Sequence, residues 1–238
     1  MGDNLGSNHI CGFIKSFKSN YFRRICKVTL KEASEVAYEI TEKFRNRENY
    51  IKDVSMHDES KTGIKEMCAF NDVHGFFITE NKCLDFMHDV LEGVCNYVLK
   101  RLLNTLIYEK SYFTLEWLNS RIKEFIYGDT ESNTPPTITY NRMKSKLSLK
   151  MSASEMLCFT KYLGLIIGDK VPRDDEHWVL YKLLATIVNI LMSPTVDVGL
   201  LRDFRDLVED FCSLYIKFYG NFLSSTIQNS TICYIMLD

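Results

Sequence analysis

The sequence predicts a mainly α-helical protein, and three observations support this fold class. Only four prolines and eleven glycines interrupt 238 residues, so few positions break a helix. Apolar residues between positions 85 and 108 recur at spacings of three and four, which places them on one helical face. They are Met87, Leu91, Val94, Val98, Leu102 and Leu106. Two Ser/Thr-x-x-Glu capping boxes, at positions 29–32 and 152–155, mark the starts of further helices.

Side chains that can cap a helix place two further helices. Thr29 and Glu32 form the first capping box, and a helix is expected to run from there to about Arg47. Thr114 is the expected N-cap of another helix, and Gly128 is expected to stop it. Both starts depend on a side-chain oxygen that accepts a backbone N–H.

The last three helices carry the clearest patterns. Ser152 and Glu155 form the second capping box, which predicts a helix over Ala153–Ile167. Residues 178–192 are apolar nearly all round and precede a proline, so this helix should be buried. Leu200–Tyr219 is amphipathic.

The N-terminal third is less regular. Residues 75–79 form the main strand candidate, a short apolar run that begins with a glycine. Residues 129–139 are rich in proline and small polar residues, which is typical of a loop. We therefore expect one domain over residues 1–84 and a helical domain over 85–238. A doubly wound sheet is excluded, because strands do not alternate with helices.

Composition and charge limit the function classes. The apolar fraction is 46% and the charged fraction 25%, as in ordinary globular domains. A net charge of −2 argues against a protein that coats nucleic acid with its whole surface, but it leaves room for a local basic patch. No apolar run is long enough for a membrane span, and residues 1–12 lack signal-peptide order. An intracellular protein without a membrane partner is expected.

Eight cysteines are present, and none form a C-x-x-C pair. Cys95, Cys158 and Cys212 lie within apolar helical patterns, where a free thiol behaves as a small hydrophobic side chain. This usage predicts a reducing compartment and no disulfide framework.

Acidic residues and a histidine cluster at the start of the 85–108 helix. Asp85, His88, Asp89 and Glu92 are three or four residues apart and share one helical flank. A carboxylate with a histidine one turn away can hold a hard divalent ion. The alternative is that Asp85 is simply the N-cap and that the other acids favour the helix N-terminus. Both interpretations stay open on the residues alone.

The extreme N-terminus offers a second candidate ligand. Residues 2–6 read Gly-Asp-Asn-Leu-Gly, which is typical of a turn. Such a turn could place Asp3 at a strand end as a metal ligand, or it could be an ordinary turn.

A basic stretch between positions 11 and 31 contains no acidic residue and several aromatic ones. Its cations are Lys15, Lys18, Arg23, Arg24, Lys27 and Lys31. Basic side chains contact phosphates and aromatic rings stack on unpaired bases, so the stretch is a candidate nucleic-acid site. The alternative is a solvated basic face over an aromatic core.

Four blocks together resemble a known family. They read GDNLGSNHICGFIKSFKSNYFRRICK, TGIKE, FITENKCLDFMHDVLEGVCNYVL and KSKLSLKMSASEMLCFTKYLGLIIGD. In this order they resemble transposase-like proteins of transposable elements, of the CACTA and Kyakuja–Dileera–Zisupton type. The resemblance covers about residues 2–220, and its most specific part is the D-x-x-H block.

The resemblance implies a fold and a chemistry. It implies a partial RNase H-like α/β remnant at the N-terminus, followed by an all-helical insertion. Such cores use two aspartates and a later glutamate to bind two ions, Mg²⁺ or Mn²⁺, for DNA phosphoryl transfer. Asp85 matches the second aspartate, His88 matches the histidine of the D-x-x-H block, and Asp3 matches the first aspartate.

Three departures from the family pattern shape the expected function. The aromatic and basic block that carries the final glutamate is not found, and Met1 leaves no room for the strand before Asp3. Arg23 stands where relatives begin a C-x-x-C pair, so a zinc site is not expected. We therefore expect a truncated or decayed transposase-like protein that lacks a complete acidic triad and is not an enzyme by itself.

A second hypothesis is a domesticated helical module that binds proteins or DNA. Its partners would be DNA or other transposase-like chains. A functional transposase acts on DNA, so the resemblance implies a nuclear location, although the sequence shows no clear nuclear localisation signal.

Overall fold

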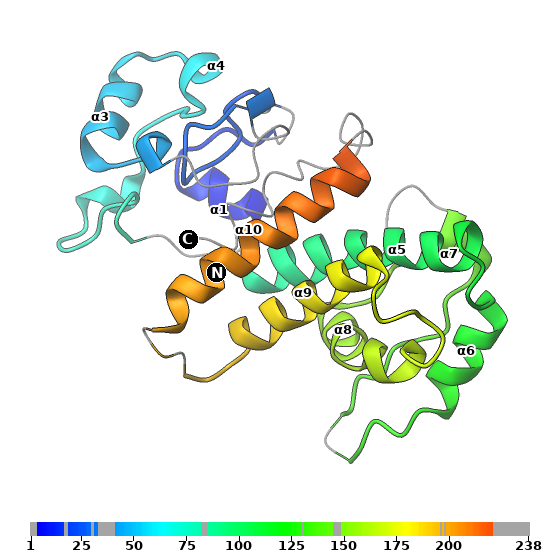
Figure 1. Cartoon of the computed structure of the whole chain (residues 1–238). Helices are drawn as coiled ribbons and strands as arrows, with labels where there is room; N and C mark the ends of the chain where they lie inside the picture. Colours follow the sequence, from blue (N-terminus) through cyan, green and yellow to red (C-terminus); the bar gives the residue numbers. More distant parts are fainter. Residues whose placement is uncertain are drawn as a thin grey trace. The chain divides into compact units, whose positions relative to one another are not determined.

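The computed structural model describes residues 4–16, 19–29, 31–32, 41–81, 85–129, 131–144, 149–195, 197 and 199–220. The described residues are mainly helical (Figure 1), as the sequence predicts. They fall into two compact units. The first holds the described residues up to Asp85 together with Gly220, and the second is Phe86–Tyr219.

The first unit is built from short helical segments around a small apolar core. The segments are α1 (Asn4–Ile10), η1 (Thr41–Lys43), α3 (Arg47–Ser55), α4 (Glu59–Thr62) and η2 (Ala69–Asp72). The core cluster consists of Phe13, Tyr50, Ile64, Cys68, Phe77 and Ile78. Helices this short are not stable alone in water, so tertiary contacts must hold them in place.

Helix α1 replaces part of the turn that was predicted over residues 2–6. The Ser7 carbonyl accepts the Cys11 N–H at 3.0 Å, and the Asn8 carbonyl accepts the Phe13 N–H at 2.8 Å. Gly12, with φ 76°, supplies the left-handed residue that ends the helical turns. Asp3 lies outside the described residues, so its predicted place at a strand end stays a prediction.

The capping box at positions 29–32 forms, but the helix predicted to run from it to about Arg47 is wrong at its end, and residues 33–40 lie outside the described residues. The Glu32 carboxylate accepts the Thr29 N–H at 2.9 Å, and the Thr29 hydroxyl accepts the Glu32 N–H at 3.2 Å. Further along, Phe44 forms an isolated antiparallel bridge with Cys26. A bridge requires extended backbone, so a continuous helix cannot reach Arg47.

Helix α3 begins at Arg47 because Asn46 caps it. The Asn46 side chain accepts the Asn49 N–H at 2.9 Å, and the Asn49 side chain accepts the Asn46 N–H at 3.0 Å. The Asn49 side chain also donates to the Phe44 carbonyl at 2.8 Å. This reciprocal Asn–Asn pair does the work of a Ser/Thr–Glu box, and a search for the latter overlooks it.

Residues 75–79 do not form the predicted strand. The Phe77 N–H donates to the Asn81 side chain at 2.7 Å, and the Ile78 N–H donates to the Asn71 side chain at 2.9 Å. Two side-chain amides thus take the place of a partner strand. The apolar run is nevertheless buried, since Phe77 and Ile78 belong to the core cluster.

The second unit is an array of longer helices. They are η3 (Met87–Cys95), α5 (Asn96–Asn104), η4 (Thr105–Glu109), α6 (Leu115–Glu124), α7 (Tyr140–Lys144), α8 (Ala153–Ile167), α9 (Glu176–Leu191) and α10 (Leu200–Tyr219). Helix α9 packs against α5, α8 and α10, and α8 also packs against η3 and α6 (Figure 1). Helices α8 and α9 are therefore central to this unit.

The predicted helix over residues 85–108 is present, with π-helical turns at both ends. Segments η3 and η4 are π-helical, and α5 lies between them. Met87, the first residue of η3, is 46% exposed, whereas Leu91 is 5% and Leu102 0% exposed. The predicted burial of Met87 is wrong, and that of the other stripe residues is confirmed.

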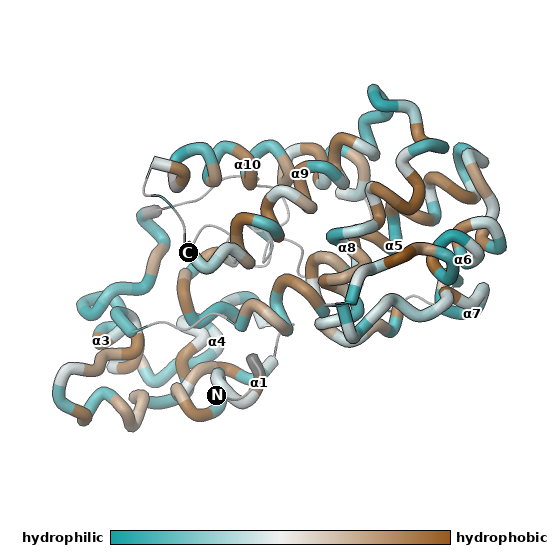
Figure 2. Tube along the Cα trace, turned by 90° about the horizontal axis from the view of Figure 1, so that it is seen from below, coloured by the Kyte–Doolittle hydropathy of each residue, from teal (hydrophilic) through white to brown (hydrophobic). Residues whose placement is uncertain are grey.

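Caps define the remaining helices. The Ser152–Glu155 box forms, and α8 covers Ala153–Ile167 as predicted. Helix α9 begins two residues earlier than expected because the Asp175 side chain caps it. Helix α10 covers Leu200–Tyr219 as predicted, and its alternating polar and apolar colouring in Figure 2 shows the amphipathic pattern. In the part of the chain that the structure describes, no helix has the length and apolar character needed to cross a membrane.

Helix α6 begins as predicted but ends early. The Thr114 side chain accepts the Trp117 N–H at 3.1 Å. The helix ends at Glu124 instead of near Gly128, because Phe125 takes an extended backbone (φ −69°, ψ 132°). The Phe125 ring then packs against the Tyr162 ring, with centroids 5.5 Å apart.

Cysteine usage differs from the expectation at one position. The described cysteines with free thiols are Cys11, Cys26, Cys68, Cys95 and Cys158. Cys212 is buried in α10 and disulfide-bonded, which corrects the prediction that its thiol is free. A local apolar pattern indicates that a cysteine is buried, but it does not indicate whether the cysteine forms a disulfide.

The buried stripe of α5 gives a direct test of the packing. Replacing Leu102 by Ala should destabilise the protein by about 2–5 kcal/mol, because a fully buried leucine leaves a cavity. The matched control Met87→Ala removes a side chain that is 46% exposed and should cost no more than about 0.5 kcal/mol. Urea unfolding followed by circular dichroism measures both values. Equal costs for the two variants would show that the stripe is not packed as described.

Candidate functional site

The D-x-x-H block lies at the start of the helical segment of the second unit. Asp85 directly precedes the helix, and His88 lies within η3; both side chains are half-buried. A Cβ added to Gly93 would lie 3.0 Å from the His88 carbonyl oxygen. Glycine at this position therefore fits the π-helical winding. Such turns are frequent at functional sites.

The described residues do not assemble a metal centre. Within the described ranges, no group of three or more His, Cys, Asp or Glu side chains is placed to hold an ion. Asp3, the partner that the resemblance implies for Asp85, lies outside those ranges. Of the residues predicted to bind metal, the structure thus places Asp85 alone, and metal binding stays a prediction.

The predicted basic patch divides into buried and exposed cations. Arg23 is 7% exposed, and its guanidinium lies 4.9 Å from the centre of the Phe22 ring. The Arg24 guanidinium is half-buried and donates to the Asn8 side-chain oxygen at 3.2 Å. Lys15 and Lys31 are exposed. Lys18 lies outside the described residues.

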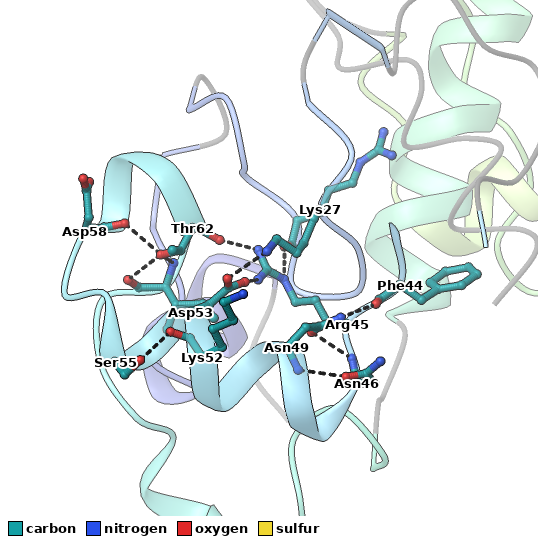
Figure 3. Close-up of polar contacts among 12 residues, drawn as sticks. Lys27, Phe44, Arg45, Asn46, Asn49, Lys52, Asp53, Ser55, Asp58 and Thr62 are labelled. Atoms are coloured by element: carbon teal, nitrogen blue, oxygen red, sulfur yellow. Dashed lines mark hydrogen bonds and ion pairs between the residues drawn. The ribbon is translucent and has the colours of Figure 1, made fainter. Parts of the chain in front are cut away.

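Lys27 from the same stretch belongs to a buried ion-pair network (Figure 3). Its Nζ lies 2.8 Å from Asp53 Oδ1, and Arg45 Nη1 lies 3.2 Å from Asp53 Oδ2. The Arg45 side chain is 0% exposed and that of Asp53 is 3% exposed. One buried carboxylate therefore faces two cations that come from different segments of the chain.

The Arg45 guanidinium satisfies further groups around it. Its Nη2 donates to the Thr62 carbonyl at 2.6 Å, and its Nε donates to the Arg23 carbonyl at 3.3 Å. Burial lowers the pKa of Arg45, and the nearby Asp53 carboxylate opposes this shift. The guanidinium remains charged, because arginine loses its proton only at extreme pH. Arg45 therefore ties three segments together: the chain at Arg23, helix α3 and the end of α4.

This network was not predicted from the sequence. It holds together three segments of the first unit through the contacts of Arg45 and Asp53. The residues lie 8 or more positions apart, so no local motif marks them. The sequence signal for this ion pair was weak: an arginine and an aspartate lie in a segment whose other polar residues cap helices.

A second buried carboxylate organises the helical unit. Asp175 accepts the Tyr112 hydroxyl at 2.9 Å and the His177 N–H at 2.9 Å, and it is paired with Lys110. Burial opposes ionisation of Asp175, but the hydrogen bonds from Lys110 and Tyr112 outweigh it and lower its pKa. The His177 ring stacks on the Phe218 ring at 4.2 Å. Asp175 thus caps α9 and joins it to the segment after η4.

Burial lowers the pKa of His177, and Lys110 adds to this effect, whereas Asp175 opposes it. Its Nδ1 lies 3.6 Å from Asp175 Oδ1, which is beyond hydrogen-bond distance. The arrangement stabilises packing between α9 and α10 through the stacked rings.

No family profile, curated protein or solved structure matches the chain.

The buried pair in the first unit yields a stability prediction. Asp53→Ala should cost about 3–5 kcal/mol, because it leaves the fully buried Arg45 charge without its carboxylate. Glu80→Ala is the matched control. Glu80 pairs with Arg47 at 2.9 Å, but both side chains are more than half exposed, so its loss should matter little.

Unfolding in urea, monitored by far-ultraviolet circular dichroism, compares the two variants. Asp53→Asn adds a third arm, since it keeps the shape of the side chain and removes only the charge. If Asp53→Ala were as stable as Glu80→Ala, Arg45 would not depend on this carboxylate.

Proposed function

We propose that the chain derives from a transposase-like protein and binds DNA without cleaving it. The observation that carries the proposal is the position of the D-x-x-H block. Asp85 directly precedes a helical unit of 134 residues, Phe86–Tyr219, and the resemblance places a helical insertion behind the second aspartate. His88 of this block lies in the π-helical segment Met87–Cys95.

The proposed RNase H-like remnant over residues 1–84 rests on the sequence blocks. The described residues of that region form short helical segments and two isolated bridges. Asp85 supports the ancestral chemistry only as one possible oxygen ligand. Mg²⁺ or Mn²⁺ would supply an activated water or DNA hydroxyl and stabilise the leaving oxygen. Among these 238 residues no block resembles the one that carries the third ligand of the family, and DNA binding is the part of the proposal that the exposed cations support.

The more exposed cations of the basic stretch support the binding role. Lys15 and Lys31 are exposed, and Arg24 is half-buried. Arg23 is buried, and Lys27 pairs with the buried Asp53 carboxylate. The proposed contact surface is therefore a smaller set than the six cations of the sequence motif.

DNA cleavage tests the absence of catalysis. Purified protein is incubated with supercoiled plasmid and either Mg²⁺ or Mn²⁺, and nicked product is measured on gels. We expect no nicking above that of Asp85→Ala, the variant that lacks the matched metal ligand. Asp89→Ala is the control, because it removes a neighbouring carboxylate of the same helix. Nicking by the wild type and Asp89→Ala that disappears in Asp85→Ala would overturn the proposal.

Salt dependence tests the binding role. Three or four phosphate contacts give a slope of log K against log salt between about −3 and −4, whereas six contacts give about −5. We expect the smaller slope, and we expect Lys15→Ala and Lys31→Ala each to weaken binding while the fold is kept. Fluorescence anisotropy with a labelled duplex measures both. An affinity that does not change with salt concentration, or that is the same in the Lys15→Ala/Lys31→Ala double variant, would show that this surface does not bind DNA.

A further inference from the structure

The start of α9 and the end of α10 meet at a stacked pair of rings. The centres of the His177 and Phe218 rings are 4.2 Å apart, and the two ring planes are inclined by only 16°. The Tyr219 ring stands edge-on to the His177 ring, with centres 6.1 Å apart. Both helices belong to the second unit and pack against each other (Figure 1). One histidine is therefore part of the contact that holds the last turn of α10.

One nitrogen of this histidine is buried without a partner. Among the described residues, His177 Nδ1 finds no hydrogen bond, although the side chain as a whole is 18% exposed. Asp175 Oδ1 lies 3.6 Å from it, which is beyond hydrogen-bond distance. A neutral imidazole can leave its unprotonated nitrogen here, whereas a protonated imidazole has an N–H on both nitrogens. Protonation would therefore bury an N–H group that has no acceptor.

The Asp175 carboxylate has no acceptor site left for this N–H. Its Oδ1 accepts the backbone N–H groups of His177 and Trp178 at 2.9 and 3.2 Å. Its Oδ2 accepts the Tyr112 hydroxyl at 2.9 Å and pairs with the Lys110 ammonium. A carboxylate offers about four acceptor sites, and these four donors fill them. Lys110 also brings a positive charge to the same carboxylate, so a second cation at His177 would be repelled.

Burial and nearby charges both act on the protonation of His177. Burial lowers its pKa, and the Lys110 ammonium adds to this shift. The three nearby carboxylates oppose the shift but do not cancel it. In the unfolded chain the pKa of a histidine is about 6.5, so the folded contact takes up its proton only at a lower pH. The charged and titratable groups around the contact are Glu109 and Lys110, Asp175 and Glu176 at the start of α9, Lys217 and Tyr219 of α10, and Arg101 of α5.

We propose that this contact is a pH-sensitive clasp, in which α9 holds the last turn of α10 while His177 is neutral and releases it when His177 takes up a proton. The protonated ring finds no free acceptor at Asp175, so it must move off the Phe218 ring to reach water. The preceding turns of α10 stay packed, because Val208 and Phe211 are fully buried. The clasp therefore frees the end of one helix and leaves the rest of the second unit folded.

The direction of the pH effect follows from the two states of the histidine. A group whose pKa is lower in the closed state binds fewer protons there than in the open state. The closed contact is therefore fully stable above about pH 6.5 and is weakened as the pH falls below that value. One pH unit lower, the open form is favoured by up to about tenfold, because the released ring titrates as an ordinary histidine.

Two measurements on the wild-type chain test the clasp. Nuclear magnetic resonance follows the titration of the His177 ring, and we expect a midpoint below about 6.5. Amide hydrogen exchange, corrected for the intrinsic effect of pH, is compared at about pH 7.5 and about pH 5.5. We expect residues 216–219 to exchange up to about tenfold faster at the lower pH, while α8 is unchanged. A midpoint at or above that of an ordinary histidine, unchanged exchange at the end of α10, or an equal increase in α8 would overturn the proposal.

A substitution separates the proton from the ring contact. His177→Phe keeps a ring against Phe218 and removes the titrating group, and it leaves no group unpaired because Nδ1 has no partner among the described residues. We expect this variant to lose the acid-induced exchange at the end of α10. The control His74→Gln removes an exposed histidine of the first unit and should behave as the wild type does. The proposal fails if His177→Phe keeps the acid-induced exchange. The two wild-type measurements decide the matter even if His177→Phe does not fold.

Discussion

The first unit depends on neutralising one buried charge. Arg45 has no exposed side-chain surface, and a guanidinium in that position must find a carboxylate and carbonyl oxygens or the unit would not form. Asp53, Thr62 and Arg23 supply them from three separate segments. Short helices with a small apolar core cannot fix their own arrangement, so the directional contacts of one cation define which segments meet. The ion-pair network thereby gives specificity where the apolar core gives stability.

In the second unit, the arrangement of the segments is fixed mainly by the packing of longer helices, and fewer charged groups are buried among the described residues. Its core is a continuous set of apolar side chains from η3, α5, α8 and α9, and its buried carboxylate, Asp175, serves mainly as a cap. A cap satisfies backbone N–H groups that a helix cannot satisfy itself. Lys110 and Tyr112 then anchor that cap to the preceding segment. Long amphipathic helices need only such end contacts, because burial along their length already fixes them.

This difference explains which elements could be predicted from the sequence. Helices α8 and α10 were found with correct bounds, because caps and periodicity are local signals. Residues 75–79 looked like a strand because they form a short apolar run, but the side chains of Asn71 and Asn81 accept their backbone N–H groups in place of a partner strand. Lys27 looked like a phosphate ligand because its partner, Asp53, lies 26 residues along the chain. Met87 fits the spacing of the stripe but is the first residue of η3 and is 46% exposed, so periodicity alone did not show where burial begins.

The buried Asp53 carboxylate also limits how many cations of the basic stretch could contact a nucleic acid. Lys27 is one of two cations on the Asp53 carboxylate, and drawing it toward a phosphate would remove half of that neutralisation. Exposed lysines gain the same counterion release without disturbing the core. Lys27 is therefore needed by the core of the first unit, and under the proposed function the exposed Lys15 and Lys31 would make the DNA contacts. The basic stretch of residues 11–31 thus combines a cation that neutralises a buried carboxylate with cations that are exposed to solvent.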